Sequence, residues 1–387
     1  MIKEIRLSSK DMKGLNKILP GHEPKLIPSK KMRKIIPVCE PKLDGNELRY
    51  VMECIRTKWI SSVGERYIRR FEEEFAHRCG TKYAVSCTSG TAALHLALAT
   101  LGIKKDDEVI IPTFTMIATA NAVTYLGAKP VLVDSEPATW NIDPEKIKDK
   151  ITSRTKVIMP VHTYGHPAEM DEILEIARRY NLYVIEDAAE AHGALYRGRK
   201  IGSLGDIACF SFYANKIITS GEGGMLTTNN KEIAKVARIL KNHAFSEERH
   251  FWHKYLGYNY RLTNLQAAIG LAQLERFDEL LEARIRNAKY YNSLLNCVEG
   301  ISLPPERKDV RNVYWMYSIL IEDDFGASRD ELRRFLAQRG IETRTFFIPI
   351  HLQPIYYKKY KREFPVSEEL CLKGMYLPSA PALKRFE

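Results

Sequence analysis

Short apolar runs alternate with amphipathic segments through the middle of the chain. Strand-like runs begin with YAVSC at residues 83–87 and EVIIP at 108–112, and they recur as far as GGMLTT at 223–228. Between them lie helix-compatible segments such as SGTAALHLALATLG at 89–102. This alternation predicts an α/β fold, in which a large domain is built on a mostly parallel central sheet.

The pattern changes on both sides of this region. The first 35 residues are polar and rich in lysine, and we expect them to form an extension that packs loosely. Residues 264–295 form one amphipathic pattern, longer than most helices of globular proteins, which we expect to be a kinked helix. A smaller α+β unit follows, with YSILIED as a strand and a helix capped by Ser328. The predicted parts are an N-terminal extension (1–35), a large domain (36–280) and a small C-terminal domain (281–387).

Composition narrows the class of protein. Hydrophobic residues make up 45% of the 387 positions and charged residues 28%, as in an ordinary globular enzyme. No run of eighteen apolar residues is present, so we expect no membrane span. Seven scattered cysteines without metal-ligand spacing indicate reduced thiols in a cytoplasmic protein and no metal site.

The net charge of +11 fits a phosphate-bearing small molecule as partner, but we interpret it mainly as solvated surface charge. The basic residues are spread along the chain, apart from clusters at 30–34 and 358–362. No nucleic-acid motif accompanies them, so we expect no nucleic-acid partner.

A Ser-Gly-Thr turn connects the first strand-like run to its helix. Ser89, Gly90 and Thr91 follow YAVSC directly. A strand that turns into a helix in this way presents free amide groups and hydroxyls at the positive end of the helix dipole, where a phosphate binds well. Serine before a helix is more often a simple N-cap, so this turn alone does not decide the function.

An acidic residue and a lysine complete the pattern. Asp187 ends the apolar run LYVIED, at the sheet edge where α/β proteins bind ligands, although a helix-capping aspartate is the commoner case. Lys216 follows 29 residues later, before a glycine-rich turn, with Ser211 and Asn215 close to it. Pyridoxal 5'-phosphate (PLP) needs an anion beside its ring nitrogen, a lysine for a Schiff base and a phosphate site. The three features together predict this cofactor.

With these pieces, the sequence resembles the PLP-dependent sugar aminotransferases of the DegT/DnrJ/EryC1/StrS family, which have fold type I. The resemblance covers residues 36–381 and rests on TSGTAALHLAL, VIEDAAEAHGA, SFYANKIITSGEGGM and GYNYRLTNLQAAIG. Within the family, FYANKIITSGEGGM and VYWMYSI resemble the enzymes that aminate GDP-4-keto-6-deoxy-D-mannose at C4. The resemblance therefore implies transfer of an amino group from L-glutamate to a nucleotide-linked keto-sugar.

The resemblance also implies a role for each candidate residue. Lys216 would be the catalytic lysine and proton shuttle, with Asp187 at the ring nitrogen and Glu190 near the ring hydroxyl. The remaining cofactor-binding set would be Ser89, Gly90, Thr91, Met116, Ser211, Asn215, Asn259 and Arg261. Asn259 and Arg261 would reach the cofactor of the other subunit in a homodimer with shared sites. The residues expected to line the sugar site are His162, Tyr164, Phe347 and His351.

Two features separate the chain from its expected relatives. Met116 stands where the family usually places an aromatic ring over the cofactor, and one more helix would be expected beyond residue 387. A dehydratase of the same fold carries histidine in place of Lys216, so the lysine favours amino transfer. Two alternatives stay open. One is an aminotransferase for a UDP- or dTDP-linked sugar or a sugar 3-ketone, and the other is a non-catalytic sensor of the same fold.

Overall fold

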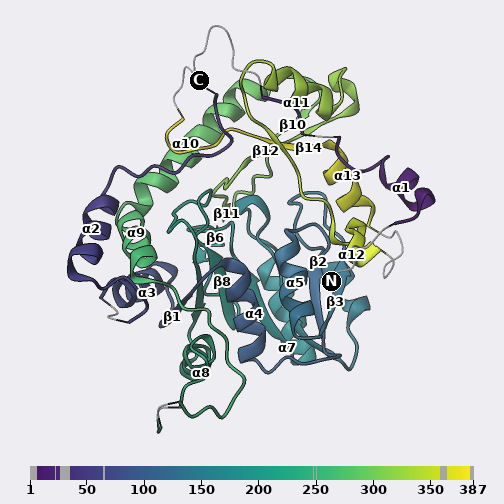
Figure 1. The fold of residues 1–387 in the computed structure, drawn as a ribbon. Coiled ribbons are helices and arrows are strands. Elements are labelled where there is room, and N and C mark those ends of the chain that lie inside the picture. Colours follow the sequence, from purple (N-terminus) through teal and green to yellow (C-terminus); the bar gives the residue numbers. More distant parts are fainter. Residues whose placement is uncertain are drawn as a thin grey trace.

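A seven-stranded sheet forms the centre of the computed structural model, which describes residues 7–21, 23–26, 35–63, 66–246, 248–249, 251–357 and 364–383. The strand order is β1-β9-β8-β5-β4-β2-β3. Figure 1 labels β1, β8, β2 and β3 of this sheet. β9 runs antiparallel to its neighbours β1 and β8, and the other pairs are parallel. The strands are β1 (Tyr83–Cys87), β2 (Glu108–Pro112), β3 (Lys129–Val133), β4 (Thr155–Ile158), β5 (Tyr183–Asp187), β8 (Ile207–Ser211) and β9 (Gly224–Thr228). The predicted α/β class with a mostly parallel sheet is confirmed.

Helices cover both faces of this sheet. α4, α5 and α8 contribute to one apolar core, and α3, α7, α9 and α10 contribute to the other. Both faces of the strands are therefore buried, which explains why the strands are continuous apolar runs. These helices are α3 (Arg66–Cys79), α4 (Gly90–Thr100), α5 (Ile117–Tyr125), α7 (Met170–Tyr180), α8 (Lys231–Lys241), α9 (Asn264–Glu275) and α10 (Phe277–Leu295).

The long amphipathic segment is two helices, where one kinked helix was expected. α9 ends at Glu275, and the backbone of its C-cap residue Arg276 (φ −112°, ψ 18°) leaves the helical region before α10 begins. Its guanidinium pairs with Asp44 and Glu279, which holds the junction. The predicted domain boundary at residue 280 falls inside α10, and the division into domains stays a prediction.

The C-terminal part carries an antiparallel sheet of its own, in the order β10-β12-β14-β13. Ser328 caps α11 as predicted, and Glu331 completes a capping box. A third sheet joins β11, β6 and β7. The strands are β6 (Leu195–Tyr196), β7 (Arg199–Lys200), β10 (Ile301–Ser302), β11 (Val310–Arg311), β12 (Tyr317–Ile321), β13 (Arg344–Thr345) and β14 (Gly374–Leu377). The other helices are α1 (Ser9–Leu15), α2 (Glu47–Thr57), α6 (Pro144–Ile147), α11 (Arg329–Ala337), α12 (Pro354–Tyr357) and α13 (Pro365–Lys373).

Part of the N-terminal extension packs firmly, contrary to expectation. Leu15 of α1 is buried, and the Gly21 amide donates a hydrogen bond to Asp330 of α11 at 2.7 Å. Arg333 of the same helix pairs with Glu23. An apolar anchor and two polar contacts outweigh the polar composition of the segment. The two basic clusters, at 30–34 and 358–362, lie outside the described residues.

Two buried histidines make the core sensitive to acid. His166 donates its Nδ1–H to the carbonyl of Pro167 at 2.9 Å, and His192 lies among Phe75, Phe210 and Phe212. Burial lowers the pKa of His166 to about 4, and burial with the charge of Lys216 lowers the pKa of His192 to about 3.

No helix within the described ranges has both the length and the apolar character needed to cross a membrane.

We expect these histidines to steepen the loss of stability in acid. Their pKa values are lower in the folded chain than in the unfolded chain, where it is about 6.5, so unfolding takes up protons. The stabilisation is complete above about pH 6.5 and falls as the pH decreases toward 4, by up to about 1.4 kcal/mol per pH unit for each histidine. Urea unfolding at pH 7, 6 and 5 should show a shallower pH dependence for His192→Phe. The exposed His77→Gln is the control, and equal slopes for wild type and His192→Phe would contradict the assignment.

Candidate active site

Three candidate segments meet at one edge of the central sheet. β1 and β8 both run antiparallel to β9, and β5 is parallel to β8, so the carboxyl ends of β1, β5 and β8 share an edge. Asp187 is the last residue of β5, Ser211 is the last residue of β8, and Ser89 follows β1. The topology therefore brings together side chains that are distant in the sequence, since Ser89 and Ser211 are 122 residues apart.

The amino end of α4 leaves two amides open. Ser89 is the N-cap, as in the simpler interpretation of the sequence, and its hydroxyl accepts a hydrogen bond from the Ala92 amide at 3.1 Å. The amides of Gly90 and Thr91 donate to no residue in the described part of the chain. Open amides at the positive end of a helix suit an anion such as a phosphate.

Two glycines permit the close packing around this helix end. A Cβ on Gly90 would lie 2.8 Å from the Cβ of Ser211, and a Cβ on Gly224 would lie 2.2 Å from the carbonyl oxygen of Ser89. Both distances are too short for carbon atoms, so any larger residue would separate α4 from β8 and β9. The glycines therefore keep Ser211 next to the open amides.

Asp187 is held from two sides. Its Oδ2 accepts a hydrogen bond from the Thr119 hydroxyl of α5 at 2.8 Å, and its Oδ1 accepts one from the Ala189 amide at 3.3 Å. Burial raises the pKa of the Asp187 carboxyl, whereas both hydrogen bonds and the charge of Lys216 act to lower it. Thr119 was not among the predicted residues, because nothing in MIATANAV distinguishes a hydroxyl that faces the sheet edge.

Lys216 lies between an aromatic ring and two carboxyl groups. Its Nζ is 3.7 Å from the centroid of the Trp315 indole. Burial lowers the pKa of the Lys216 amine, and the nearby Glu190 and Asp187 oppose this change. Removal from water favours the neutral amine, which is the nucleophilic form.

A buried arginine fixes the turn that carries Lys216. Arg284 of α10 donates to the carbonyls of Asn215 and Lys216, each at 3.2 Å, and to the carbonyl of Trp315 at 2.7 Å. The Trp315 indole N–H donates to the same Asn215 carbonyl at 2.9 Å. Sequence analysis missed Arg284 and Trp315. The signal for Arg284 was a charged residue at an apolar position of α10, one turn after Leu280.

An aromatic wall continues from this turn. Glu190 is buried, and its Oε2 accepts a hydrogen bond from the Tyr164 amide at 2.8 Å. The Tyr164 ring stacks on Trp315 with centroids 6.2 Å apart and contacts Phe347 at 5.1 Å. Burial raises the pKa of Glu190, and the charge of Lys216 opposes this change. Tyr164, Phe347 and Glu190 thus connect to the Lys216 turn through Trp315, and their roles toward cofactor and sugar stay predictions.

The two predicted histidines lie in the interior. His162 is completely buried, with Nδ1 accepting from a backbone amide and Nε2 bonded to Glu186 at 3.2 Å. His351 contacts the Thr113 hydroxyl through Nδ1 at 2.8 Å and Glu368 through Nε2 at 3.2 Å. Neither ring has a nitrogen left for a ligand, so their contact with a sugar stays a prediction that this arrangement does not favour.

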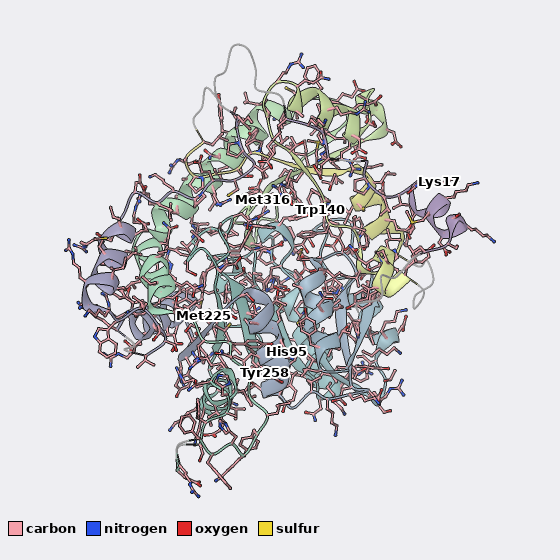
Figure 2. The ribbon with its side chains drawn as sticks, in the orientation of Figure 1. Lys17, His95, Trp140, Met225, Tyr258 and Met316 are labelled. Carbon is pink, nitrogen blue, oxygen red and sulfur yellow. The ribbon has the colours of Figure 1, made fainter. Side chains whose placement is uncertain are left out.

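Asn259 and Arg261 form a contact of their own. The Arg261 guanidinium donates to the Oδ1 of Asn259 at 3.0 Å and to that of Asn242 at 3.3 Å. Thr263 caps α9, so neither Asn259 nor Arg261 is the cap of that helix. The same turn packs on α4 through Tyr258, whose ring lies 4.8 Å from that of His95 (Figure 2).

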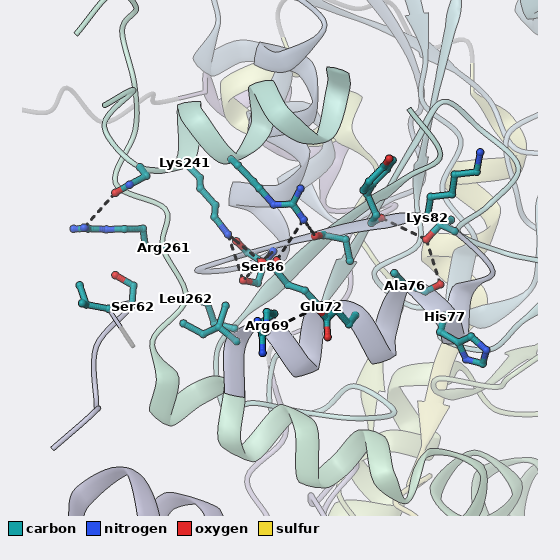
Figure 3. Close-up of a pocket in the computed structure, with 18 residues that line it drawn as sticks. Ser62, Arg69, Glu72, Ala76, His77, Lys82, Ser86, Lys241, Arg261 and Leu262 are labelled. Atoms are coloured by element: carbon teal, nitrogen blue, oxygen red, sulfur yellow. Dashed lines mark hydrogen bonds and ion pairs between the residues drawn. The ribbon is translucent and has the colours of Figure 1, made fainter. Parts of the chain in front are cut away.

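Arg261 also lines a cavity of about 1060 Å³ between α3, α8 and β1 (Figure 3). Inside this cavity the Lys241 ammonium bonds Glu72 at 3.1 Å and the carbonyl of Ser86 at 2.8 Å. Neither Lys216 nor Asp187 belongs to the cavity wall. Within one chain, the structure therefore does not join Asn259 and Arg261 to the Lys216 site.

The residues around Lys216 fit PLP. The site offers an amine, a carboxylate and two open amides, and the buried Oδ1 of Asn215 has no partner among the described residues. Met116, at the N-cap position of α5, is 52% exposed and is free to cover a ligand. In the part of the chain that the structure describes, no three side chains of metal-ligand type form a group.

Comparison with known proteins places the chain in a family. The model of the DegT/DnrJ/EryC1/StrS aminotransferase family matches residues 41–387. GDP-perosamine synthase of Caulobacter vibrioides is 50% identical over 349 residues, which are 90% of this chain and 94% of that protein. GDP-perosamine synthase of Escherichia coli O157:H7 is 47% identical over 350 residues, again 90% and 94%. The crystal structure of S. venezuelae DesV is similar with a TM-score of 0.85 and 38% identity, over 91% of this chain and 95% of that one. The chain belongs to the DegT/DnrJ/EryC1/StrS aminotransferase family.

Proposed function

We propose that the chain transfers an amino group from L-glutamate to the 4-keto group of GDP-4-keto-6-deoxy-D-mannose, giving GDP-perosamine, with PLP as cofactor. The observation that carries this proposal is the meeting of a lysine amine, a buried carboxylate and two open helix amides at one sheet edge. The nucleotide and sugar are supported by the identity of 47% and 50% with two GDP-perosamine synthases. Membership of an aminotransferase family favours an enzyme over a non-catalytic sensor.

Each part of the proposed cofactor has a matching group. The amides of Gly90 and Thr91, with the Ser211 hydroxyl, would hold the phosphate. Asp187 would pair with the ring nitrogen, and Lys216 would bond the aldehyde carbon. When bound, PLP supplies an electron sink and a carrier for the amino group.

The chain's own residues prepare this chemistry in two ways. Thr119 and the Ala189 amide donate to the Asp187 carboxylate and favour its charged form, which is the form able to pair with a protonated ring nitrogen. Burial lowers the pKa of Lys216, so a larger share of its amine is neutral and able to accept a proton from a substrate carbon. The aromatic wall of Tyr164 and Phe347 would exclude water beside it and pack on the sugar ring.

The substrate and the lysine can be tested with one set of assays. With L-glutamate as donor, kcat/KM should be highest for GDP-4-keto-6-deoxy-D-mannose among GDP-, UDP- and dTDP-linked keto-sugars, with the amino sugar detected by mass spectrometry. Lys216→Ala should abolish turnover and keep the circular dichroism spectrum, because Lys216 is the amine that acts on Asp187 and Glu190. The exposed Lys235→Ala on α8 is the matched control and should keep full activity.

Two results would contradict these assignments separately. A higher kcat/KM for a dTDP- or UDP-linked sugar, or for a 3-keto sugar, would change the substrate but not the reaction. Turnover by purified Lys216→Ala would instead remove the lysine from the mechanism.

The support of Asp187 gives a second test. Asp187→Asn keeps the shape but removes the charge, and we expect kcat to fall by about a hundredfold or more. Thr119→Val removes one hydrogen bond of about 1 kcal/mol, so a loss of about fivefold is expected. Thr124→Val on the same helix is the control, because its hydroxyl bonds Ala120 and Tyr356 instead. Near-normal activity of Asp187→Asn would show that the carboxylate has only a structural role.

The proposed functional unit is a homodimer with shared sites. Asn259 and Arg261 have no task around Lys216 within their own chain. The segment just before them exposes Phe251, Tyr255 and Leu256 by 73%, 66% and 85%. An apolar surface of this kind is typical of an interface, and two-fold symmetry would give two equivalent sites.

Complementation tests the shared site. Inactive Lys216→Ala mixed with an inactive Asn259→Ala/Arg261→Ala variant under subunit exchange should regain activity, since one site of each mixed dimer is complete. Random exchange makes half of the dimers mixed, so about a quarter of the wild-type activity is expected. Lys216→Ala mixed with Asp187→Asn is the control and should stay inactive, because both residues come from the same subunit. No recovery in demonstrated mixed dimers, or a fully active monomer by light scattering, would contradict the proposal.

A further inference from the structure

Trp315 touches Lys216 at two places. The Lys216 Nζ lies 3.7 Å from the centre of the indole, well within the distance at which a cation is attracted to an aromatic face. The edge of the same ring donates its N–H to the Asn215 carbonyl at 2.9 Å. A single side chain, only 4% exposed, thus contacts both the amine of the lysine and the backbone that carries it.

The ring has little freedom to move away. Arg284 donates to the carbonyls of Asn215, Lys216 and Trp315 itself, so the lysine turn and the tryptophan are fixed to one guanidinium. Trp315 also stacks on Tyr164, with an interplanar angle of 24°. The distance between the amine and the ring therefore follows from a rigid frame.

No carboxylate takes the place of the ring. Glu190 accepts from the Tyr164 amide and Asp187 accepts from Thr119, and neither forms a hydrogen bond with the amine in the described part of the chain. The charged and titratable groups that act on Lys216 from neighbouring segments are Glu190, Asp187, Arg284, Cys39 and His192. The indole is the direct contact, and these groups act over longer distances.

We propose that Trp315 is a positioning residue, which holds the Lys216 side chain over its ring whenever the amine is free. The inference rests on the proposed function for the role of the lysine. In the proposed cycle the lysine would be released from the aldehyde carbon of the cofactor and would have to return to it. A fixed position of the free amine would then make this return faster. An aromatic face suits this task, because it attracts the ammonium without forming a bond that must be broken.

The test measures the amine itself in the full-length chain without cofactor or substrate. Acetic anhydride acylates only the neutral amine, and mass spectrometry of the Lys216 peptide gives the extent of labelling at each pH. The ring favours the ammonium, so Trp315→Leu should label Lys216 at lower pH. We expect a shift of half to one pH unit, or about threefold to tenfold more neutral amine at a given pH.

A graded series separates positioning from core packing. Trp315→Tyr and Trp315→Phe should give smaller shifts than Trp315→Leu, because both keep a ring, and kcat should fall more than KM rises in all three. Trp140→Phe is the matched control, since Trp140 is equally buried at 4% exposure but packs on Phe346. Its labelling curve should match that of the wild type.

Each outcome has one consequence. An unchanged labelling curve in folded Trp315→Leu, or in Trp315→Phe if the leucine variant does not fold, would overturn the proposal and leave Trp315 as a packing residue. An equal shift in Trp140→Phe would also overturn it. Failure of the aminotransferase assay alone would concern the proposed function, because the labelling needs neither cofactor nor substrate.

Discussion

The arrangement of the site depends on the hydrogen bonds that the buried guanidinium of Arg284 donates to backbone carbonyls. Transfer of a charge from water into a protein interior is costly unless hydrogen bonds replace the lost hydration. Arg284 obtains them from the carbonyls of Asn215, Lys216, Trp315 and Ser379. Those carbonyls belong to the lysine turn, the segment just before β12 and the segment just after β14. The Arg284 charge can therefore be buried only when these segments, which are distant in the sequence, lie together.

The central sheet supplies the other half of the site. Its strand order places the ends of β1, β5 and β8 at one edge, and this edge carries Ser89, Asp187 and Ser211. Gly90 and Gly224 then allow the helix end to approach the strands closely enough to present open amides. The sheet positions the groups that are proposed to bind a phosphate and a ring nitrogen, while α10 and the C-terminal part position the amine. The candidate site therefore lies where the central sheet meets α10 and the C-terminal part.

The sequence predicted most of the part of the site that the central sheet provides. It predicted little of the part that α10 and the C-terminal segments provide. Strands buried on both faces are short apolar runs, so their number and order along the chain were readable. The N-cap Ser89 and the acidic end of β5 followed from the same pattern. Arg284 was missed because periodicity shows which positions of α10 face the core, but not which carbonyls a buried arginine will meet there. His162 shows the converse limit: the resemblance implies that it lines the sugar site, whereas both of its ring nitrogens bond groups inside the core, and its contact with a sugar stays a prediction. The break at Arg276 escaped prediction because ion pairs, and no proline or glycine, end the helix.

The electrostatics of the site follow from the positions that the central sheet, α10 and the C-terminal part give to its charged groups. Asp187 and Glu190 are buried carboxyl groups whose pKa values are raised by burial, and the pKa of Lys216 is lowered for the same reason. Each group alone would favour its neutral form. The carboxylates favour the charged form of the lysine, and the charged lysine favours the charged form of the carboxyl groups. A cationic ring nitrogen beside Asp187 would take over part of the role that Lys216 plays in stabilising the carboxylate. The lysine would then lose part of the attraction that keeps it protonated, so binding at one end of the site favours the neutral amine at the other.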